Sequence, residues 1–319
     1  EGFLKAQQET DVKKILPLID RYHLSREMIP KEFLSKPEVW EAMLYSMGLT
    51  AVIRNLANMT RIGLLTDHSE TTKKVIARIT DTAQLQKARI HPVNVLIGTM
   101  TYQAGHGVRG TNTWTPVGKI IAGLNDAFYA SFGFVPSTGK NFLLGVDVSG
   151  SMTMSMVAGV PNMSPRTAAA AMAMTTLRTE PNHTILGFST GIIPLKLHAR
   201  MSLEEVERYM DSLPFSGTDC AAPMIYALKN KIPVDGFVVY TDNETWYGSI
   251  HPFQALKNYR NALNPNAKSI MAAFVASQRT IADPSDPGML DIVGFDSSVP
   301  NIIADFVAGP QPTTMPEEE

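Results

Sequence analysis

The stretch FLLGVDVSGSM, residues 142–152, decides how the second half of this 319-residue chain folds. It begins as a nearly continuous apolar run, which is typical of a parallel strand buried on both faces. It ends in an aspartate and two serines at alternate positions, Asp147, Ser149 and Ser151. Oxygen-bearing side chains in this position indicate ligands for a divalent metal, although Asp and Ser also build turns and cap helices.

Strands and helices alternate after residue 140. Further apolar runs predict strands at 183–189, 235–243 and 268–276. Helical patterns lie between and beside them, at 164–179, 202–213, 219–230 and 251–263. This alternation predicts an α/β domain over residues 141–308, with helices on both sides of a doubly wound, mostly parallel sheet. The Pro- and Glu-containing tail, 309–319, is expected to be disordered.

Loops that follow separate strands bring more oxygen donors to one edge of that sheet, because ligands bind at the carboxyl ends of parallel strands. Asp242 ends the strand 235–243, and Thr218 lies just before the helix 219–230. The predicted metal ligands are therefore Asp147, Ser149, Ser151, Thr218 and Asp242. Hydroxyl donors favour Mg²⁺, although Mn²⁺ or Ca²⁺ fits the same set. Two carboxylates leave the ion incompletely neutralised, so it can attract an outside carboxylate or phosphate.

The first part of the chain predicts helices only. Segments with apolar residues at helical spacing lie at 11–24, 35–48, 51–65, 70–79, 91–107 and 115–133. Pro17 is expected to kink or interrupt the first of them, and Thr50 and Ser69 are predicted N-caps. Successive helices with short loops predict a HEAT-like array over residues 1–134, although no strict internal repeat is present. The segment 135–140, VPSTGK, is the predicted linker.

Basic residues gather in the first part. Residues 1–139 carry a net charge of +4 and residues 141–319 a net charge of −7, and eight basic residues accompany three acidic ones between positions 50 and 110. This imbalance indicates a polyanion partner, although ordinary solvated helix faces give the same pattern. Lys and Arg neutralise phosphates, and His can stack on unpaired bases. The candidate RNA-binding residues are Arg54, Arg61, Lys87, Arg89, His91, His106 and Arg109; His91 also fits a turn residue ahead of Pro92.

Composition narrows the functional classes. Hydrophobic residues make up 44% and charged residues 18% of the chain, which is typical of a globular protein, and no run of 18 apolar residues is present. The single cysteine, Cys220, excludes intrachain disulfides and fits a reducing compartment, so we expect a cytoplasmic protein. No Ser/His/Asp set, Walker loop or H-E-x-x-H motif appears, and we expect no enzyme activity.

Several stretches, in the same order, resemble the Ro autoantigen ribonucleoproteins. They are LTAVIRNLANMT (49–60), KARIHPVNVLIGTMTYQAGHGVRG (87–110), TGKNFLLGVDVSGSM (138–152), GTDCAAPMIYAL (217–228), VVYTDNETWYGSIHP (238–252) and TIADPSDPGMLDIVGFD (280–296). The resemblance implies a ring of HEAT-like helices, the TROVE module, followed by a von Willebrand factor A domain with a metal-ion-dependent adhesion site. The five predicted metal residues match that site position by position.

The resemblance also implies function. Members of the family bind small noncoding Y RNAs on a basic outer face and admit single-stranded ends of misfolded RNAs into a central hole, in RNA quality control or maturation. In bacterial relatives the Y RNA tethers an exoribonuclease. The family has further helices before the segment matching Glu1, so we interpret the chain as an N-terminally truncated bacterial-type or phage-type member. It is expected to be a monomer or to be completed by the missing helices, without a membrane partner.

Two other hypotheses stay open from the residues alone. The A-type domain could be a metal-dependent protein-adhesion module whose helices bind no RNA. A metal-dependent nuclease is the third, but hydrolysis needs a positioned general base beside the metal-bound water, and the sequence offers no clear one.

Overall fold

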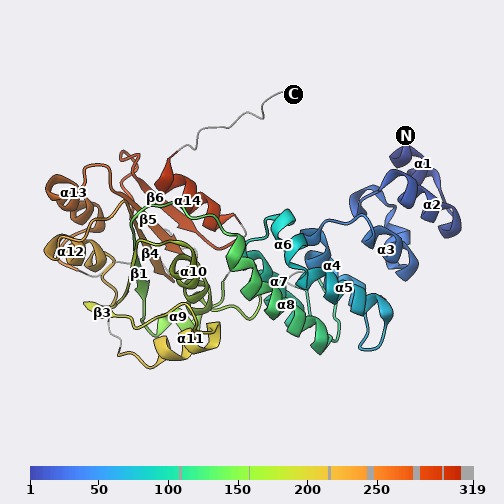
Figure 1. Cartoon of the computed structure of the whole chain (residues 1–319), viewed down its shortest axis with the longest axis horizontal. Coiled ribbons are helices and arrows are strands. Elements are labelled where there is room, and N and C mark those ends of the chain that lie inside the picture. Colours follow the sequence, from blue (N-terminus) through green and yellow to red (C-terminus); the bar gives the residue numbers. More distant parts are fainter. Residues whose placement is uncertain are drawn as a thin grey trace. The chain divides into compact units, whose positions relative to one another are not determined.

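The computed structural model of the chain describes residues 1–107, 110–157, 159–214, 217–242, 248–275, 281–296 and 298–309. It divides into two compact units, Glu1–Phe134 and Val135–Glu319. The first unit contains helices only in its described part, and the second contains a sheet covered by helices (Figure 1). This order confirms the predicted fold class. Within the described residues, no helix is both long and apolar enough to cross a membrane.

The first unit is a succession of short helices. Its α-helices are α1 (Gly2–Gln8), α2 (Val12–Tyr22), α3 (Pro37–Leu44), α4 (Leu49–Arg61), α5 (Glu70–Thr80), α6 (Thr82–Ala88), α7 (Pro92–Gln103) and α8 (Gly118–Ser131). Three 3-10 turns accompany them, η1 (Arg26–Met28), η2 (Lys31–Ser35) and η3 (Phe132–Phe134). Pro17 does not interrupt α2. The Ser69 cap is confirmed, since its side chain accepts a hydrogen bond from Thr72 N at 3.1 Å.

The prediction that Thr50 is the N-cap of α4 is wrong. Helix α4 begins at Leu49, so its N-cap is Gly48 and Thr50 lies in the first turn. Glycine is an acceptable N-cap without a side-chain oxygen, and the serine or threonine rule therefore places the start of this helix two residues late.

Helices α4, α5, α7 and α8 form the core of the first unit. A Cβ atom on Gly98 of α7 would lie 2.4 Å from Cγ2 of Ile53 in α4, so these two helices approach closely there. Tyr102 is 1% exposed, and its hydroxyl accepts a hydrogen bond from Val117 N at 3.0 Å and shares one with Thr60 Oγ1 at 2.9 Å. One buried phenol thus joins α4, α7 and the start of α8.

The second unit is an α/β domain. Its strands are β1 (Phe142–Asp147), β2 (His183–Phe188), β3 (Ile192–Pro194), β4 (Gly236–Thr241), β5 (Lys268–Ala273) and β6 (Met289–Val293). Its helices are α9 (Ser151–Met154), α10 (Pro165–Thr179), α11 (Leu203–Asp211), α12 (Ala222–Lys229), α13 (Pro252–Ala262) and α14 (Val299–Ala308). The strand order is β3-β2-β1-β4-β5-β6, and all pairs are parallel except β2–β3.

Strand β1 lies at the centre, and every one of its residues is buried. The chain order reverses there, because β2 pairs with one side of β1 and β4 with the other. The carboxyl end at such a switch point is where ligands bind in open α/β sheets. Asp147 is the last residue of β1, so the fold puts its carboxylate at this point.

Helices cover both faces of the sheet (Figure 1). On one face, α12 packs so closely that a Cβ atom on Gly145 would lie 2.5 Å from Cγ of Pro223. On the other face, Gly236 at the start of β4 has no room for a Cβ atom beside Val307 of α14. Helix α10 also contacts β1, β2 and β4, and its alanines, from Ala168 to Ala171, are all 0% exposed. Small residues at these contacts let the helices lie close to the sheet.

The predicted linker is tied to the second unit. The Glu180 side chain is 7% exposed and accepts hydrogen bonds from Ser137 Oγ and Thr138 N, each at 2.8 Å, and from Gly139 N at 3.2 Å. The predicted disordered tail lies outside the described residues apart from Gly309.

His91 gives the first unit a pH-dependent stability. Its Nδ1 accepts a hydrogen bond from Val93 N at 3.2 Å and so caps α7, and the side chain is 8% exposed. Burial lowers the pKa of His91 from 6.5 to about 4, because the site favours the neutral ring. The stabilisation is complete above the unfolded-state pKa and is lost as the pH falls from about 6.5 through 4, by roughly 3 kcal/mol at most.

We therefore expect the free energy of unfolding to fall over this pH range, and His91→Asn to remove that part of the fall. Asparagine caps helices well and does not titrate. Urea unfolding followed by tryptophan fluorescence measures the effect, since Trp40 and Trp114 belong to this unit. His68→Asn at an exposed position is the control. An unchanged pH dependence in His91→Asn would contradict the assignment.

Candidate metal centre

The loop after β1 is organised around the Asp147 carboxylate. Asp147 is 0% exposed, and its Oδ1 accepts a hydrogen bond from Ser149 N at 2.8 Å. In the short turn that this bond closes, the hydroxyl oxygens of Ser149 and Ser151 lie 2.9 Å apart. Ser151 then begins the short helix α9.

Two other segments reach the same carboxylate. Thr241, the last residue of β4, donates its hydroxyl proton to Asp147 Oδ2 at 2.9 Å, and the Thr218 hydroxyl lies 3.5 Å from the same oxygen. The loop carrying Thr218 is held in place by the Asp219 N–H, which donates to Ser189 O at 2.8 Å. Asp242 follows Thr241 directly and is 7% exposed. The structure thus brings the five predicted metal residues to one edge of the sheet.

This edge is electrostatically costly without a cation. Burial raises the pKa of Asp147, hydrogen bonds from Ser149 and Thr241 oppose that rise, and the negative charge of Asp242 adds to it. A positive charge placed beside the buried Asp147 carboxylate would relieve this cost.

The donor set fits a small hard cation. Ligand oxygens on adjacent corners of a magnesium octahedron are about 2.9 Å apart, given metal–oxygen distances of about 2.0–2.1 Å. The Ser149 and Ser151 hydroxyl oxygens have that separation, 2.9 Å, before any ion is considered. Within the described residues, no group of three or more His, Cys, Asp or Glu side chains could hold a metal. Three of the five candidate donors are hydroxyls, whereas zinc usually takes cysteine, histidine or carboxylate ligands.

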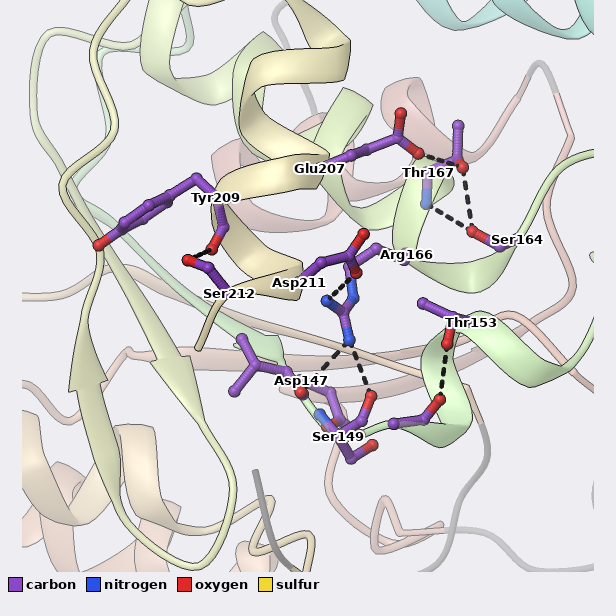
Figure 2. A network of polar contacts seen from close by, with 12 residues as sticks. Asp147, Ser149, Thr153, Ser164, Arg166, Thr167, Glu207, Tyr209, Asp211 and Ser212 are labelled. Atoms are coloured by element: carbon purple, nitrogen blue, oxygen red, sulfur yellow. Dashed lines mark hydrogen bonds and ion pairs between the residues drawn. The ribbon is translucent and has the colours of Figure 1, made fainter. Parts of the chain in front are cut away.

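A buried arginine contacts the loop that carries the candidate metal donors Ser149 and Ser151 (Figure 2). Arg166 of α10 is 3% exposed, and its Nη2 donates to Ser149 O at 2.9 Å and to Val148 O at 3.3 Å. Its Nη1 forms an ion pair with Asp211 Oδ1 at 2.8 Å. Figure 2 shows the guanidinium between Asp211 and the loop. Arg166 therefore fixes the backbone that carries the serine donors and connects it to α11.

The same network joins α10 to α11 at a second point. Thr167 Oγ1 donates to Glu207 Oε1 and lies 3.0 Å from the Ser164 hydroxyl (Figure 2). Burial raises the pKa of Glu207, and the hydrogen bond from Thr167 opposes that rise. The Arg166–Asp211 pair and the Thr167–Glu207 hydrogen bond thus both connect α10 to α11.

A cleft of about 570 Å³ opens at the donors. Its lining includes Ser149, Ser151 and Thr218 together with Arg166 and Met154. Met154 is 87% exposed, so one apolar side chain of the lining is in contact with solvent beside the hydroxyls. A ligand that reaches the donors therefore also meets an apolar edge.

The predicted RNA-binding residues lie on the first unit. Arg54 and Arg61 are exposed and seven residues apart on α4, which places them on one face of that helix, and Lys87 is exposed at the end of α6. Arg89 is exposed in a left-handed conformation, φ 47°, at the C-cap of α6. The structure does not test their role, which stays a prediction.

The other three RNA-binding candidates are His106, Arg109 and His91, and each is in a different situation. His106 is exposed, and its backbone forms an isolated bridge with Thr113. Arg109 lies outside the described residues. His91 must be withdrawn, because its ring is buried, caps α7 and favours the neutral form, as described above. The alternative role that the sequence left open for it, a turn residue ahead of Pro92, is the one the structure has.

Sequence reasoning missed two residues, Thr241 and Arg166, that contact the candidate metal loop. Thr241 could have been found from strand register: Val146 pairs with Tyr240, so the next positions, Asp147 and Thr241, are neighbours. Arg166 also has a signal in the sequence. It is the one charged residue in the run 165–175, whose residues are all buried, and a cation at a helix N-terminus is unfavourable without anionic or carbonyl partners.

Cys220 is predicted to be unreactive. It is 0% exposed, and burial raises the pKa of its thiol far above its usual value, with further contributions from Asp147, Asp219 and Asp242. A thiol is nucleophilic only as the thiolate. At pH 8 we expect almost no reaction with Ellman's reagent in the native protein and rapid reaction of one thiol after unfolding in urea. Cys220→Ser supplies the blank, and complete labelling of the native protein within seconds would contradict the burial.

Comparison with known proteins finds a matching family model for each of the two units. A family model described as the Ro60 vWA domain matches residues 141–307, and a TROVE domain model matches residues 21–101. Two curated relatives are both called RNA-binding protein RO60. One, from Deinococcus radiodurans, is 42% identical over 310 residues, and the other, from Caenorhabditis elegans, is 42% identical over 311 residues.

These matches cover 97% of this chain but 58% and 48% of the two relatives, so the chain spans about half the length of the curated relatives it matches. The crystal structure of the Deinococcus radiodurans RO (RSR) protein is similar with a TM-score of 0.89 at 42% identity, over 97% of this chain and 62% of that chain. The sequence, the fold and the relatives share a helical TROVE segment followed by a Ro-type von Willebrand factor A domain. The chain belongs to the Ro family.

Proposed function

We propose that this chain is the RNA-binding part of a ribonucleoprotein. The observation that carries the proposal is its 42% identity, over 97% of its length and across both units, to proteins named RNA-binding protein RO60. The ligands proposed are small noncoding Y RNA and the single-stranded ends of misfolded RNAs. The process proposed is RNA quality control or maturation, in which the Y RNA tethers an exoribonuclease.

The first unit supports this proposal physically. Its exposed cationic side chains, Arg54, Arg61, Lys87 and Arg89, are suited to phosphate contacts, and they need no rearrangement of the core to make them. The second unit carries a net negative charge in its sequence and would repel a phosphate backbone except where a cation is held. The proposal therefore assigns RNA to the first unit and a separate ligand to the metal centre.

The metal centre is proposed to hold Mg²⁺, or Mn²⁺ or Ca²⁺, through Asp147, Ser149, Ser151, Thr218 and Asp242. When bound, the cation supplies a positive charge that can accept one oxygen ligand from outside the protein. The chain's own residues position the oxygen donors. Asp147 fixes three loops, Arg166 holds the serine backbone, and α9 begins at Ser151.

A second candidate function is metal-dependent protein adhesion. The exposed Met154 at the cleft favours it, because apolar side chains around a charged centre are typical of protein interfaces. In that case a protein carboxylate would bind the metal and chelation would abolish the interaction. Nuclease activity is the remaining alternative, and metal-dependent shortening of the RNA would reveal it.

RNA binding should depend steeply on salt. If the four exposed cations each neutralise one phosphate, log K against log salt has a slope of about −3 for a single strand. Filter binding of a structured RNA with a 3′ single-stranded tail, at several salt concentrations, measures this slope. Arg54→Ala combined with Arg61→Ala should make it shallower by about 1.4.

The same titration with EDTA separates the candidate functions. Unchanged RNA affinity after chelation fits RNA bound by the first unit, whereas loss of a protein partner on chelation fits adhesion through the metal. The proposal would be wrong if the unsubstituted chain bound the tailed RNA with no salt dependence.

Arg166 should control metal affinity without touching the metal. Arg166→Met keeps the length of the side chain but removes its bonds to Val148 O and Ser149 O, and it leaves Asp211 unpaired at the cleft. We expect Mn²⁺ affinity, measured by the loss of the free-ion electron paramagnetic resonance signal, to fall about tenfold or more, as for other residues that orient metal ligands. Asp147→Asn should abolish binding.

Asp305→Asn, an exposed carboxylate on α14, is the matched control and should bind Mn²⁺ as the unsubstituted chain does. Full Mn²⁺ affinity in Arg166→Met, with the fold intact by circular dichroism, would show that the arginine is structural only.

A further inference from the structure

A cleft in the first unit has the properties of a binding site. It encloses about 850 Å³ and lies between the end of α3, the turn leading into α4, and helices α5 and α6. This volume is in the range of pockets that bind small ligands, about 300–1,000 Å³. Its wall includes the apolar side chains of Leu44, Leu49 and Val75.

Arg78 gives this cleft a fixed shape. The half-buried guanidinium donates through Nη1 to Leu44 O, through Nη2 to Met47 O and through Nε to Gln84 Oε1 at 3.1 Å. One side chain on α5 therefore ties the turn between α3 and α4 to α6. The cation is satisfied by these acceptors and keeps a positive charge at the floor of the cleft.

Tyr45 stands in water at this cleft. It is 85% exposed, although it lines the same cavity as the buried Leu49 and Val75. A single exposed aromatic is ordinary on a protein surface. Here its ring adjoins an apolar wall and a group of cations, which is the combination that binds the bases of single-stranded nucleic acid.

The charge of the lining is positive. Lys74 and Lys87 are exposed and line the cleft, and no ion pair within the described residues involves either of them. The adjacent Lys73, in contrast, pairs with Glu70 at 2.7 Å and does not line the cleft. Glu41 is the single acidic residue of the lining, and its carboxylate accepts a hydrogen bond from Thr71 Oγ1 at 3.1 Å. A ligand with negative charge on either side of a flat ring fits these groups.

We infer that this cleft binds one nucleotide of a single-stranded RNA, with the base stacked on Tyr45 against the apolar wall and the flanking phosphates paired with Lys74 and Lys87. The inference rests on the proposed RNA-binding function and assigns it a site. Every base presents a ring face, so the cleft has no strong sequence preference. A blunt duplex does not fit, because its bases stay inside the stack.

Fluorescence anisotropy with a labelled 12-nucleotide oligouridylate tests the site. Tyr45→Ala should weaken binding by about 5- to 100-fold, the range measured for loss of one stacked base, and Tyr45→Phe should bind as the unsubstituted chain does. Lys74→Ala combined with Lys87→Ala should make the slope of log K against log salt shallower by about 1.4, since two phosphate contacts are lost. Lys73→Ala, one residue away and outside the cleft, should leave the slope unchanged. All these side chains are exposed, so the variants keep the fold.

The outcomes separate the site from the function. If the unsubstituted chain binds oligouridylate and Tyr45→Ala binds equally well, or if Lys73→Ala lowers the salt slope as much as the cleft variants do, the cleft is not the site although the chain binds RNA. If the unsubstituted chain binds no RNA, the proposed function itself is wrong and the inference falls with it. A blunt 12-base-pair duplex should show the same affinity for Tyr45→Ala as for the unsubstituted chain, and a loss there would overturn the stacking role.

Discussion

The arrangement of the second unit's functional edge depends on one buried carboxylate. Asp147 accepts hydrogen bonds from its own loop through Ser149 N and from the end of β4 through Thr241 Oγ1, and the Thr218 hydroxyl lies close by. A charged group with 0% exposure is expensive to bury unless its lone pairs are used. The hydrogen bonds that offset the cost of burying this carboxylate also bring three separate segments together. The position of the oxygen donors therefore depends on the same bonds as the burial of Asp147.

Arg166 of α10 supplies a buried positive charge next to that edge. A buried cation near the first turn of α10 is unfavourable by itself, and it is stabilised by two loop carbonyls and by Asp211. The arginine is therefore connected to the loop donors on one side and to α11 on the other. The guanidinium is one side chain through which a shift of the loop backbone would reach α11.

The architecture could be predicted largely from hydrophobic pattern. The buried runs of β1 and β4 and the amphipathic helices α4, α5 and α11 carry strong periodic signals, and the Ser202 capping box of α11 reinforces one of them. The elements that were not predicted are mainly short or at the edge, and they are α1, α6, α9, β3, β6, α14 and the 3-10 turns η1 and η2. A three-residue antiparallel strand or a four-residue helix has too few residues to show a period.

The candidate metal centre was only partly predictable, for a related reason. Asp147, Ser149 and Ser151 share one loop and form a pattern that can be read locally. Thr241 and Arg166 act through contacts at sequence separations of 94 and 17 residues, which depend on strand register and on helix packing. His91 shows the converse error: its place among basic residues predicts contact with RNA, whereas Pro92 after it starts a helix that the imidazole caps. Local composition cannot distinguish these two uses of the ring.

The central claim is that oxygens from three loops converge on one dication at the end of β1. The most direct measurement is anomalous diffraction from crystals of the chain grown with Mn²⁺. The account predicts one anomalous peak between the hydroxyls of Ser149 and Ser151, within roughly 2.0–2.4 Å of both oxygens. No peak at that position, with the two serine side chains turned apart, would contradict it.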